Sequence, residues 1–267
     1  MVTWTSAIVT IAVLAYIIIF IFLKGVPYIK PSLFSYTYNS DNVSLMPALI
    51  STVMMTTLSL VIAVPLGVFA AVFLTEYAKR GNRAVALIRM TMETLSGIPS
   101  IVYGLFGMLF FVTFLGWGFS VLAGTFTLSI MILPLIMRSA EEAIIAVPDT
   151  YREGSFGLGA GRLRTVFRIV LPSAATGILA GVILAVGRIV GETAALIYTA
   201  GTVAQVPDSV YESARTLSVH MYALSSEGLH IGEGYATAVI LLILVILINA
   251  CSAWIARRVG TGFGRNA

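Results

Sequence analysis

Residues 141–201 read EEAIIAVPDTYREGSFGLGAGRLRTVFRIVLPSAATGILAGVILAVGRIVGETAALIYTAG. The first half of this stretch holds charged side chains and glycines, which make it too polar to lie in lipid. The second half, after Leu171 and Pro172, is apolar and carries Arg188 and Glu192 four residues apart. Because side chains at this spacing meet on one helix face, we expect a long polar loop that leads into a membrane helix with a charged pair.

The composition is that of a membrane protein. Of the 267 residues, 58% are hydrophobic and only 10% are charged, whereas soluble domains are about a quarter charged. A hydrocarbon core of roughly 30 Å needs about 20 apolar residues per helix, so the chain has room for six spans and for no soluble catalytic domain. The apolar runs are continuous rather than alternating, which favours helices over a β-barrel. We therefore predict an all-α integral membrane protein.

The apolar runs predict six spans, at residues 6–23, 46–74, 98–115, 120–138, 170–200 and 236–256. No basic residue precedes the first run and no small-residue cleavage site follows it, so we expect this run to stay as a span. We divide the chain into the first span with its loop (1–45), a membrane core (46–256) that contains the polar loop at about 139–169, and a tail (257–267).

The basic residues lie mainly on one side of this predicted topology. Six spans place both termini on the same face, together with twelve lysines and arginines: Lys79, Arg80, Arg83, Arg89, Arg138, Arg152, Arg162, Arg164, Arg168, Arg257, Arg258 and Arg265. The opposite face holds Lys24, Lys30 and Arg215. Since basic loops stay in the cytoplasm, we expect both termini and the polar loop to be cytoplasmic.

Two connecting segments have helical periodicity. Residues 76–97 fit either a helix on the cytoplasmic surface or an extension of the third span. Residues 211–235 suggest an amphipathic external helix at the membrane surface or against a partner protein. His220 and His230 in this segment lack a ligand spacing, so we expect ordinary polar loop residues rather than metal ligands. Cys251, the single cysteine, excludes an internal disulfide and is expected to be a small buried residue of the last span.

The polar loop at 139–169 is longer than a connection between two spans requires. Such loops are usually functional or disordered, and the apolar residues in this one argue against disorder. Its segment GLGAGRLR (157–164) lacks the Gly-x-x-x-x-Gly-Lys-Ser/Thr spacing of a phosphate-binding loop. A short helix that ends in Gly159 and packs into a groove on a cytoplasmic partner fits better, because small residues allow close approach. A solvated loop without a partner is the alternative.

The same loop carries a motif that resembles one from a known family. Glu153-Gly154-Ser155, three residues, Gly159, nine residues, Ile169, one residue and Leu171-Pro172 are similar to the EAA motif of ABC-transporter permeases, Glu-Ala-Ala-x3-Gly-x9-Ile-x-Leu-Pro. Two small residues, Gly154 and Ser155, replace the alanines and lower the helix propensity. The resemblance implies a type I, MetI-like permease fold whose segment 153–159, Leu158 included, is a coupling helix docked on an ATP-hydrolysing subunit. The chain itself would then bind no cofactor, and ATP and Mg would belong to that partner.

Longer runs resemble one branch of this family. The segments GRIVGETAALIYTAG (187–201), TLSVHMYALSSEG (216–228) and YATAVILLIL (235–244) look like the PstA-type subunit of phosphate-specific ABC transporters. This resemblance implies a phosphate importer in a prokaryotic plasma (inner) membrane, surrounded by lipid. Its implied partners are a PstC-type permease subunit, two copies of an ATP-binding subunit and an external phosphate-binding protein, and none of them is a nucleic acid.

The charged pair of the fifth predicted span is the candidate substrate contact. Arg188 lies sixteen residues beyond Pro172, about 24 Å along a helix and past the membrane midplane. A charge in lipid costs at least about 3 kcal/mol, so Arg188 and Glu192 should line a path between helices. Arg188 can offer paired donors to a phosphate oxyanion, Glu192 can balance the charge, and Thr193 can add a hydroxyl group. A structural ion pair that locks helices together is the alternative.

Small residues recur along the same span. Their spacing predicts that a neighbouring helix approaches closely, and the residues concerned are Gly177, Gly181, Gly187 and Gly191. Both a tightly packed moving interface and a narrow substrate path fit this pattern.

Three other functions are alternatives for a membrane protein of this composition. The first is a permease subunit for molybdate or sulfate, which differs from a phosphate permease only in the transported anion. An enzyme acting on a lipid phosphate needs clustered acid–base or metal-binding residues, but the cytoplasmic acidic residues form no such cluster and the histidines lie on the opposite face. A stand-alone secondary transporter predicts an internal repeat, and no clear repeat is present.

Overall fold

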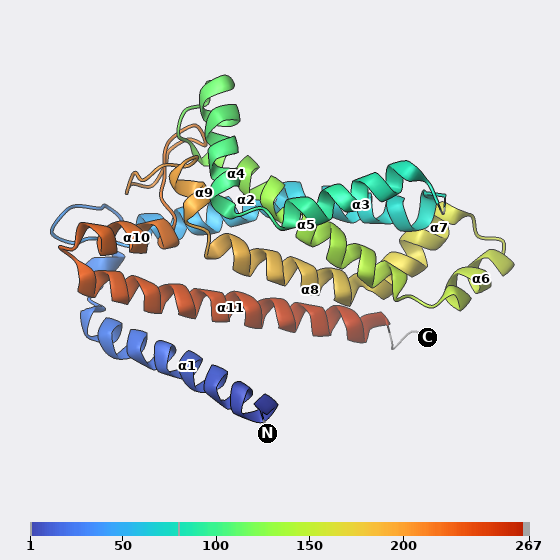
Figure 1. Cartoon of the computed structure of the whole chain (residues 1–267), viewed down its shortest axis with the longest axis horizontal. Helices are drawn as coiled ribbons and strands as arrows, with labels where there is room; N and C mark the ends of the chain where they lie inside the picture. Colours follow the sequence, from blue (N-terminus) through green and yellow to red (C-terminus); the bar gives the residue numbers. More distant parts are fainter. Residues whose placement is uncertain (1, 80, 264–267) are drawn as a thin grey trace.

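The computed structural model describes residues 2–79 and 81–263, and every regular element in this part of the chain is helical (Figure 1). The elements are α1 (Val2–Gly25), η1 (Val26–Tyr28), η2 (Pro31–Phe34), α2 (Met46–Val72), η3 (Phe73–Tyr77), α3 (Arg83–Ser96), α4 (Ser100–Gly107), η4 (Met108–Phe114), α5 (Val121–Ile145), α6 (Asp149–Gly157), α7 (Arg162–Thr165), η5 (Val166–Val170), α8 (Leu171–Val190), α9 (Ala194–Ile197), α10 (Leu217–Glu227) and α11 (Ile231–Phe263).

Five helical stretches are long and apolar enough to cross a membrane: Thr3–Tyr28, Met46–Tyr77, Val121–Ile145, Arg162–Val190 and Ile231–Cys251. A sixth span results if α3 and the α4–η4 helix, which meet at a bend of 102°, are counted as one broken span. With the bent pair counted as one span, the structure has the six spans that the sequence predicted. Segment 83–96 is therefore not a straight extension of the third span. The bend lies at Gly97 and Ile98, where the following Pro99 disfavours helical geometry for the residue before it.

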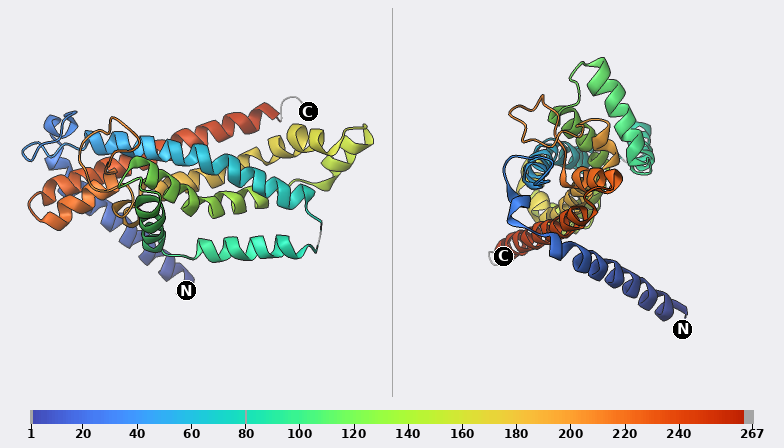
Figure 2. Two further views of the ribbon diagram at one scale, coloured as in Figure 1. Left: turned by 90° about the horizontal axis from the view of Figure 1, so that it is seen from above. Right: turned by 90° about the vertical axis from the view of Figure 1, so that its left-hand side faces the viewer.

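The long helices form an elongated bundle. α5 packs against α2 on one side and α8 on the other, and α11 packs against α8 (Figures 1 and 2). The main core lies between α2, α5, α8 and α9, around Met55, Leu128, Ile132, Ile189 and Leu196. α6 and α7 lie at one end of the bundle and α10 at the other (Figure 1). We call these the α6 end and the α10 end.

α1 stands apart from the bundle. Its contact with α11 is near its C-terminal end, where Gly25 lies against the backbone of Tyr235 and Phe20 packs edge-on against the Tyr235 ring. Elsewhere its apolar side chains are exposed, and Figure 2 shows the helix pointing away from the other helices. An apolar helix in this position is stable in lipid or against another subunit, because neither environment offers water to its side chains.

The expected span at 170–200 is wrong at both ends. The helix begins at Arg162 and contains the widened turn η5, just before Pro172. Proline lacks the backbone N–H group that an α-helical turn uses, and a π-type turn accommodates that loss. The helix then ends at Val190, and residues 191–193 are not helical before the short α9.

Two further expectations are corrected. α10 is not an amphipathic surface helix, because Leu217, Val219, His220 and Leu224 are buried within this chain. His220 is consequently a core residue rather than a loop residue. Cys251 is exposed on α11 and is not buried. In both cases the tertiary packing, which sequence periodicity does not report, decides the burial.

Candidate functional site

α6 is the short helix expected in the polar loop. Asp149 occupies its first turn, where a negative charge favours the helix dipole. Its C-terminal end is closed by a hydrogen bond from the N–H of Ala160 to the carbonyl of Ser155, at 3.1 Å. Gly159 lies between them with φ +79°, a conformation that glycine adopts without steric cost. The predicted short helix is present, but it ends at Gly157, two residues before Gly159, which forms the left-handed turn that closes it.

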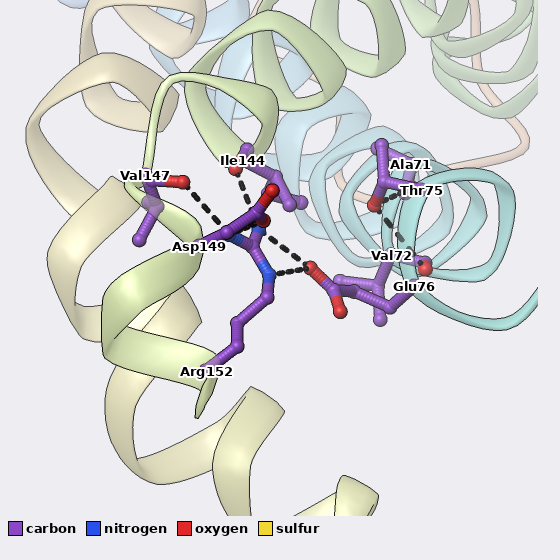
Figure 3. A network of polar contacts seen from close by, with 8 residues as sticks. All are labelled: Ala71, Val72, Thr75, Glu76, Ile144, Val147, Asp149 and Arg152. Carbon is purple, nitrogen blue, oxygen red and sulfur yellow. Dashed lines mark hydrogen bonds and ion pairs between the residues drawn. The ribbon is translucent and has the colours of Figure 1, made fainter. Parts of the chain in front are cut away.

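Arg152 anchors α6 to two membrane helices (Figure 3). Its Nε and Nη2 atoms donate to one carboxylate oxygen of Glu76, at 3.0 and 2.8 Å. Nη2 also donates to the carbonyl of Ile144 at 3.0 Å, and Nη1 donates to the carbonyl of Val147 at 2.7 Å. Ile144 lies in the last turn of α5 and Val147 follows the helix, so the guanidinium group interacts favourably with the negative end of the helix dipole. The Arg152 and Glu76 side chains are only 15% and 10% exposed, so the contact is largely shielded from water.

The residues of the EAA-like motif separate into two groups. Glu153, Gly154, Leu158 and Gly159 are exposed, and Leu158 is 91% exposed. Ser155 is buried, with its Oγ atom 2.8 Å from Oγ1 of Thr165. Ile169, Leu171 and Pro172 are partly buried where α8 begins. The first group can meet a partner. In the second group, Ser155 ties α6 to Thr165, at the start of the continuous helix that leads into α8.

The exposed side of α6 is apolar as well as charged. Tyr151, Phe156 and Leu158 are all exposed there. A groove of about 800 Å³ lies beside α6 and is lined in part by η3 and α3. Exposed apolar side chains clustered in this way, together with a groove, are typical of a protein interaction site.

Arg188 lines a cavity of about 620 Å³ between α3, α5 and α8. Its neighbours in the lining include Ser96 and Met131, whereas Ile145 lines the cavity near the α6 end. Met131 and Ile145 are fourteen residues apart on α5, which corresponds to about 21 Å along the helix. The cavity therefore runs from the α6 end deep into the bundle, with Arg188 at its inner part.

Five further charged residues line this cavity. They form two ion pairs, Arg89 with Glu141 at 2.5 Å and Arg138 with Glu142 at 3.0 Å, and the fifth is Glu93. Among the described residues no ion pair joins Arg188 to any carboxylate. Sequence reasoning did not assign these five to the path. Two features of the sequence could have indicated them. The charges lie where apolar helices meet the polar loops, and Arg138 and Glu142 are four residues apart on one helix face.

Glu192 and Thr193 are not in the cavity lining. The carboxylate of Glu192 is buried and accepts a hydrogen bond from the N–H of Ala195, at 3.1 Å. The carbonyl of Glu192 accepts a hydrogen bond from Oγ of Ser218, at 2.5 Å. The expected meeting of Arg188 and Glu192 on one helix face is therefore wrong, because α8 ends at Val190 and the helical register is lost before Glu192.

The close helix approach expected at the glycines occurs at two of the four. A Cβ atom on Gly177 or Gly181 would collide with Ala143 or Ser139 of α5, respectively. Gly187 has open space, and Gly191 faces only a carbonyl of its own helix. The tight α5–α8 contact is therefore confined to the half nearer the α6 end. Within the described residues, no cluster of histidine, cysteine and carboxylate side chains could hold a metal ion.

Residues 63–263 match the protein family described as "Binding-protein-dependent transport system inner membrane component". The chain belongs to this family. It is 32% identical over 215 residues to the "Probable ABC transporter permease protein YqgI" of Bacillus subtilis, a match that covers 74% of this chain and 72% of that relative. As a member of this family, the chain is a multi-pass membrane component of a binding-protein-dependent transport system, and it is a permease subunit rather than the subunit that hydrolyses ATP.

Other relatives of the permease are phosphate transport proteins. It is 38% identical over 136 residues to "Phosphate transport system permease protein PstA 1" of Mycobacterium tuberculosis, covering 51% of this chain and 44% of that one. It is 31% identical over 184 residues to "Phosphate transport system permease protein PstA 2" of Mycobacterium bovis, covering 67% and 60%. The chain thus spans less than two thirds of the length of both proteins.

Solved structures support the expected fold of the permease. A chain of the MetNI methionine ABC transporter aligns with a TM-score of 0.62 at 21% identity, over 80% of this chain and 94% of that one. A chain of a bacterial alginate ABC transporter aligns with a TM-score of 0.65 at 17% identity, over 96% and 95%. The MetI-like permease fold expected from the EAA-like motif is confirmed.

Proposed function

We propose that this permease is one of the two membrane subunits of an ATP-driven phosphate importer in a prokaryotic plasma membrane. The observation that carries the proposal is the position of Arg188, in the inner part of a cavity that leads to the α6 end. The identity with PstA proteins supports phosphate as the cargo. The distribution of basic residues supports a cytoplasmic α6 end and cytoplasmic termini.

In this proposal Arg188 receives the anion within the membrane. A guanidinium group stays charged at every physiological pH and presents parallel donors that match two oxygens of a phosphate group. Among the described residues no carboxylate pairs with Arg188, so its charge is available to an anion. Nearer the α6 end, Glu141 and Glu142 already pair with Arg89 and Arg138. Those neutralised pairs hold an anion less tightly than Arg188 does, which favours its release toward the cytoplasm.

Glu192 and Thr193 have a positioning role in the same proposal. The carboxylate of Glu192 holds the first turn of α9, and its carbonyl is bonded to Ser218 of α10. These two bonds, and a long one from Oγ1 of Thr193 to the carbonyl of Gly191 at 3.5 Å, hold residues 191–193 in a non-helical conformation just beyond the end of α8. A break in a membrane helix beside a substrate site is tolerated where it is buried in protein.

α6 couples this path to the ATPase. The exposed residues Glu153, Gly154, Leu158 and Gly159 would dock on the ATP-binding subunit, while Ser155, Ile169, Leu171 and Pro172 hold the helix in place. The complete importer would contain a PstC-type permease, two ATP-binding subunits that carry ATP and Mg, and an external phosphate-binding protein.

The test compares anions in the reconstituted complex. The rate of ATP hydrolysis is measured with phosphate, sulfate and molybdate, each with its own binding protein. We expect phosphate with its binding protein to stimulate hydrolysis and the other two anions to leave the basal rate unchanged. Stimulation by sulfate or molybdate without stimulation by phosphate would replace the proposal with the permease for that oxyanion.

A further inference from the structure

Four residues form a compact group at the α10 end, which we call the α10 cluster: Tyr38, Val43, Arg215 and His220. The guanidinium carbon of Arg215 lies 4.6 Å from the centre of the Tyr38 ring. The same ring meets His220 edge-on, with 6.1 Å between ring centres. Arg215 is only 6% exposed and His220 is fully buried. The cluster lies outside the cavity lined by Arg188.

The guanidinium group of Arg215 has donors without partners. Within the described part of the chain, its Nε and Nη2 atoms are buried without a hydrogen bond. The imidazole ring of His220 faces the backbone of Val43, although neither ring nitrogen has a partner at ordinary hydrogen-bond geometry. A buried guanidinium stays charged, so burial without a counter-ion is strongly unfavourable. The face of Tyr38 offsets only part of that cost.

The two unpartnered atoms of Arg215 form one edge of the guanidinium group. This edge carries two roughly parallel N–H groups, the arrangement that binds two oxygens of an oxyanion or carboxylate. Arg152 in the same chain uses the same edge, Nε and Nη2, to hold Glu76. In Arg215 the same two N–H groups are buried and have no acceptor.

Two features of the surroundings also favour an anion. Arg215 and Thr216 directly precede α10, an eleven-residue helix whose N-terminal end carries partial positive charge, although the first N–H group, that of Leu217, already donates to Oγ1 of Thr52 at 2.8 Å. Val43, a buried neighbour in the cluster, has φ 45°, which is unfavourable for a β-branched residue. Strained backbone of this kind persists where the surrounding structure holds it, often at ligand sites.

We propose that the α10 cluster is a binding site for an inorganic oxyanion of the phosphate and sulfate class. The Nε and Nη2 atoms of Arg215 hold two oxygens of the anion. Tyr38 lies over the guanidinium group in this structure, so the segment that carries it must move to admit the anion. In the proposed orientation the site is on the external side, separate from Arg188.

An anion bound at this site would affect the non-helical residues 191–193, which follow the helix that carries Arg188. Ser218 in the first turn of α10 donates to the carbonyl of Glu192, at 2.5 Å. A shift of the N-terminal end of α10 therefore acts directly on residues 191–193. This consequence rests on the proposed transport function, whereas the anion site itself does not.

The test is hydrogen–deuterium exchange of the assembled transporter, measured with increasing inorganic phosphate, sulfate or chloride. We expect phosphate and sulfate to slow exchange of residues 36–44 and 216–220 in a saturable manner, and chloride to have no effect. Arg215→Gln should abolish this protection, and Arg215→Lys, which keeps the charge but loses the paired donors, should weaken the apparent affinity at least tenfold.

Arg188→Gln separates this proposal from the proposed transport function. Protection of residues 36–44 should persist in that variant even though uptake is lost. Absence of protection in the wild-type transporter, or equal protection in Arg215→Gln, would overturn the anion site. If Arg215→Gln fails to assemble, Arg215→Lys decides: an unchanged affinity in that variant also overturns it.

Discussion

Arg152 and Glu76 are 76 residues apart in the sequence, yet two guanidinium nitrogens lie 3.0 and 2.8 Å from one carboxylate oxygen. Glu76 belongs to η3, the continuation of α2, and Arg152 belongs to α6. α6 is thus bonded to a membrane helix that is not its neighbour along the chain. A displacement of α6 must move the end of α2 together with α5.

We predict that Glu76→Gln weakens this connection. Hydrogen bonds to charged groups contribute about 1.5–3 kcal/mol, so the thermal stability of the complex should fall. The rate of ATP hydrolysis should also be stimulated less by the transported substrate. The measurement is a double-mutant cycle with Arg152→Gln. The exposed pair Arg138–Glu142, with side chains 68% and 66% exposed, is the control and should show a coupling energy below about 1 kcal/mol. Equal coupling energies for the two pairs would contradict the prediction.

Gly159 should tolerate no side chain without a loss of coupling. At φ +79° an L-residue costs about 1–2 kcal/mol, and a bulky residue there would also enlarge the exposed surface of the docking helix. Gly159→Leu is expected to reduce co-purification of the ATPase or to uncouple hydrolysis from uptake. Gly157→Ala is the matched control, because Gly157 is helical and has open space around it. Unchanged coupling in Gly159→Leu would refute the docking role.

Arg188→Gln should abolish phosphate uptake and leave assembly intact. The substitution removes the charge that faces the cavity but keeps a polar side chain of similar length. Uptake of labelled phosphate into proteoliposomes measures the effect, and co-purification of the subunits controls for assembly. Arg188→Lys should retain partial uptake, since it keeps the charge without the paired donors. Normal uptake by Arg188→Gln would rule out the binding role.

His220 should make the stability of the protein depend on pH. Burial, and secondarily the charge of Arg215, lower the pKa of His220 from 6.5 to about 3. The unfolded chain takes up a proton near pH 6.5 while the folded chain does not, so stability falls as the pH drops below about 6.5. We expect the melting temperature to decrease between pH 7.5 and pH 5, and to decrease less in His220→Phe.

The second histidine provides the control for that experiment. His230 lies between α10 and α11 and is partly exposed. His230→Gln should keep the pH dependence of the wild-type protein. An identical decrease in the wild type and in His220→Phe would show that other groups cause the effect.

Several features followed from local properties of the sequence. The continuous apolar runs predicted membrane helices, because hydrophobicity and helix length are set by nearby residues. The short helix α6 followed from small residues and from Gly159, which closes its C-terminal end, although the helix itself ends at Gly157. The EAA-like spacing indicated a permease, and the family match agrees with it.

Other features depended on contacts between distant segments. The bond between Arg152 and Glu76, and the meeting of Arg89 with Glu141 across two helices, leave no local pattern in the sequence. The end of α8 at Val190 was also not evident from the sequence, because Glu192 is the single charged residue between Gly191 and Ile197 and no proline interrupts them. The structure shows that α9, which follows the break, packs closely on α4, since a Cβ atom on Gly104 would lie 2.8 Å from Cα of Ala195.

The sequence by itself therefore determined the class of protein, the apolar segments and the presence of a short helix in the polar loop, since each depends on the chemistry of neighbouring residues. Only the tertiary structure decided which charges meet. Arg188 faces a cavity rather than Glu192, and Arg215 is buried against Tyr38, because the packing of separate helices sets the direction and burial of a side chain.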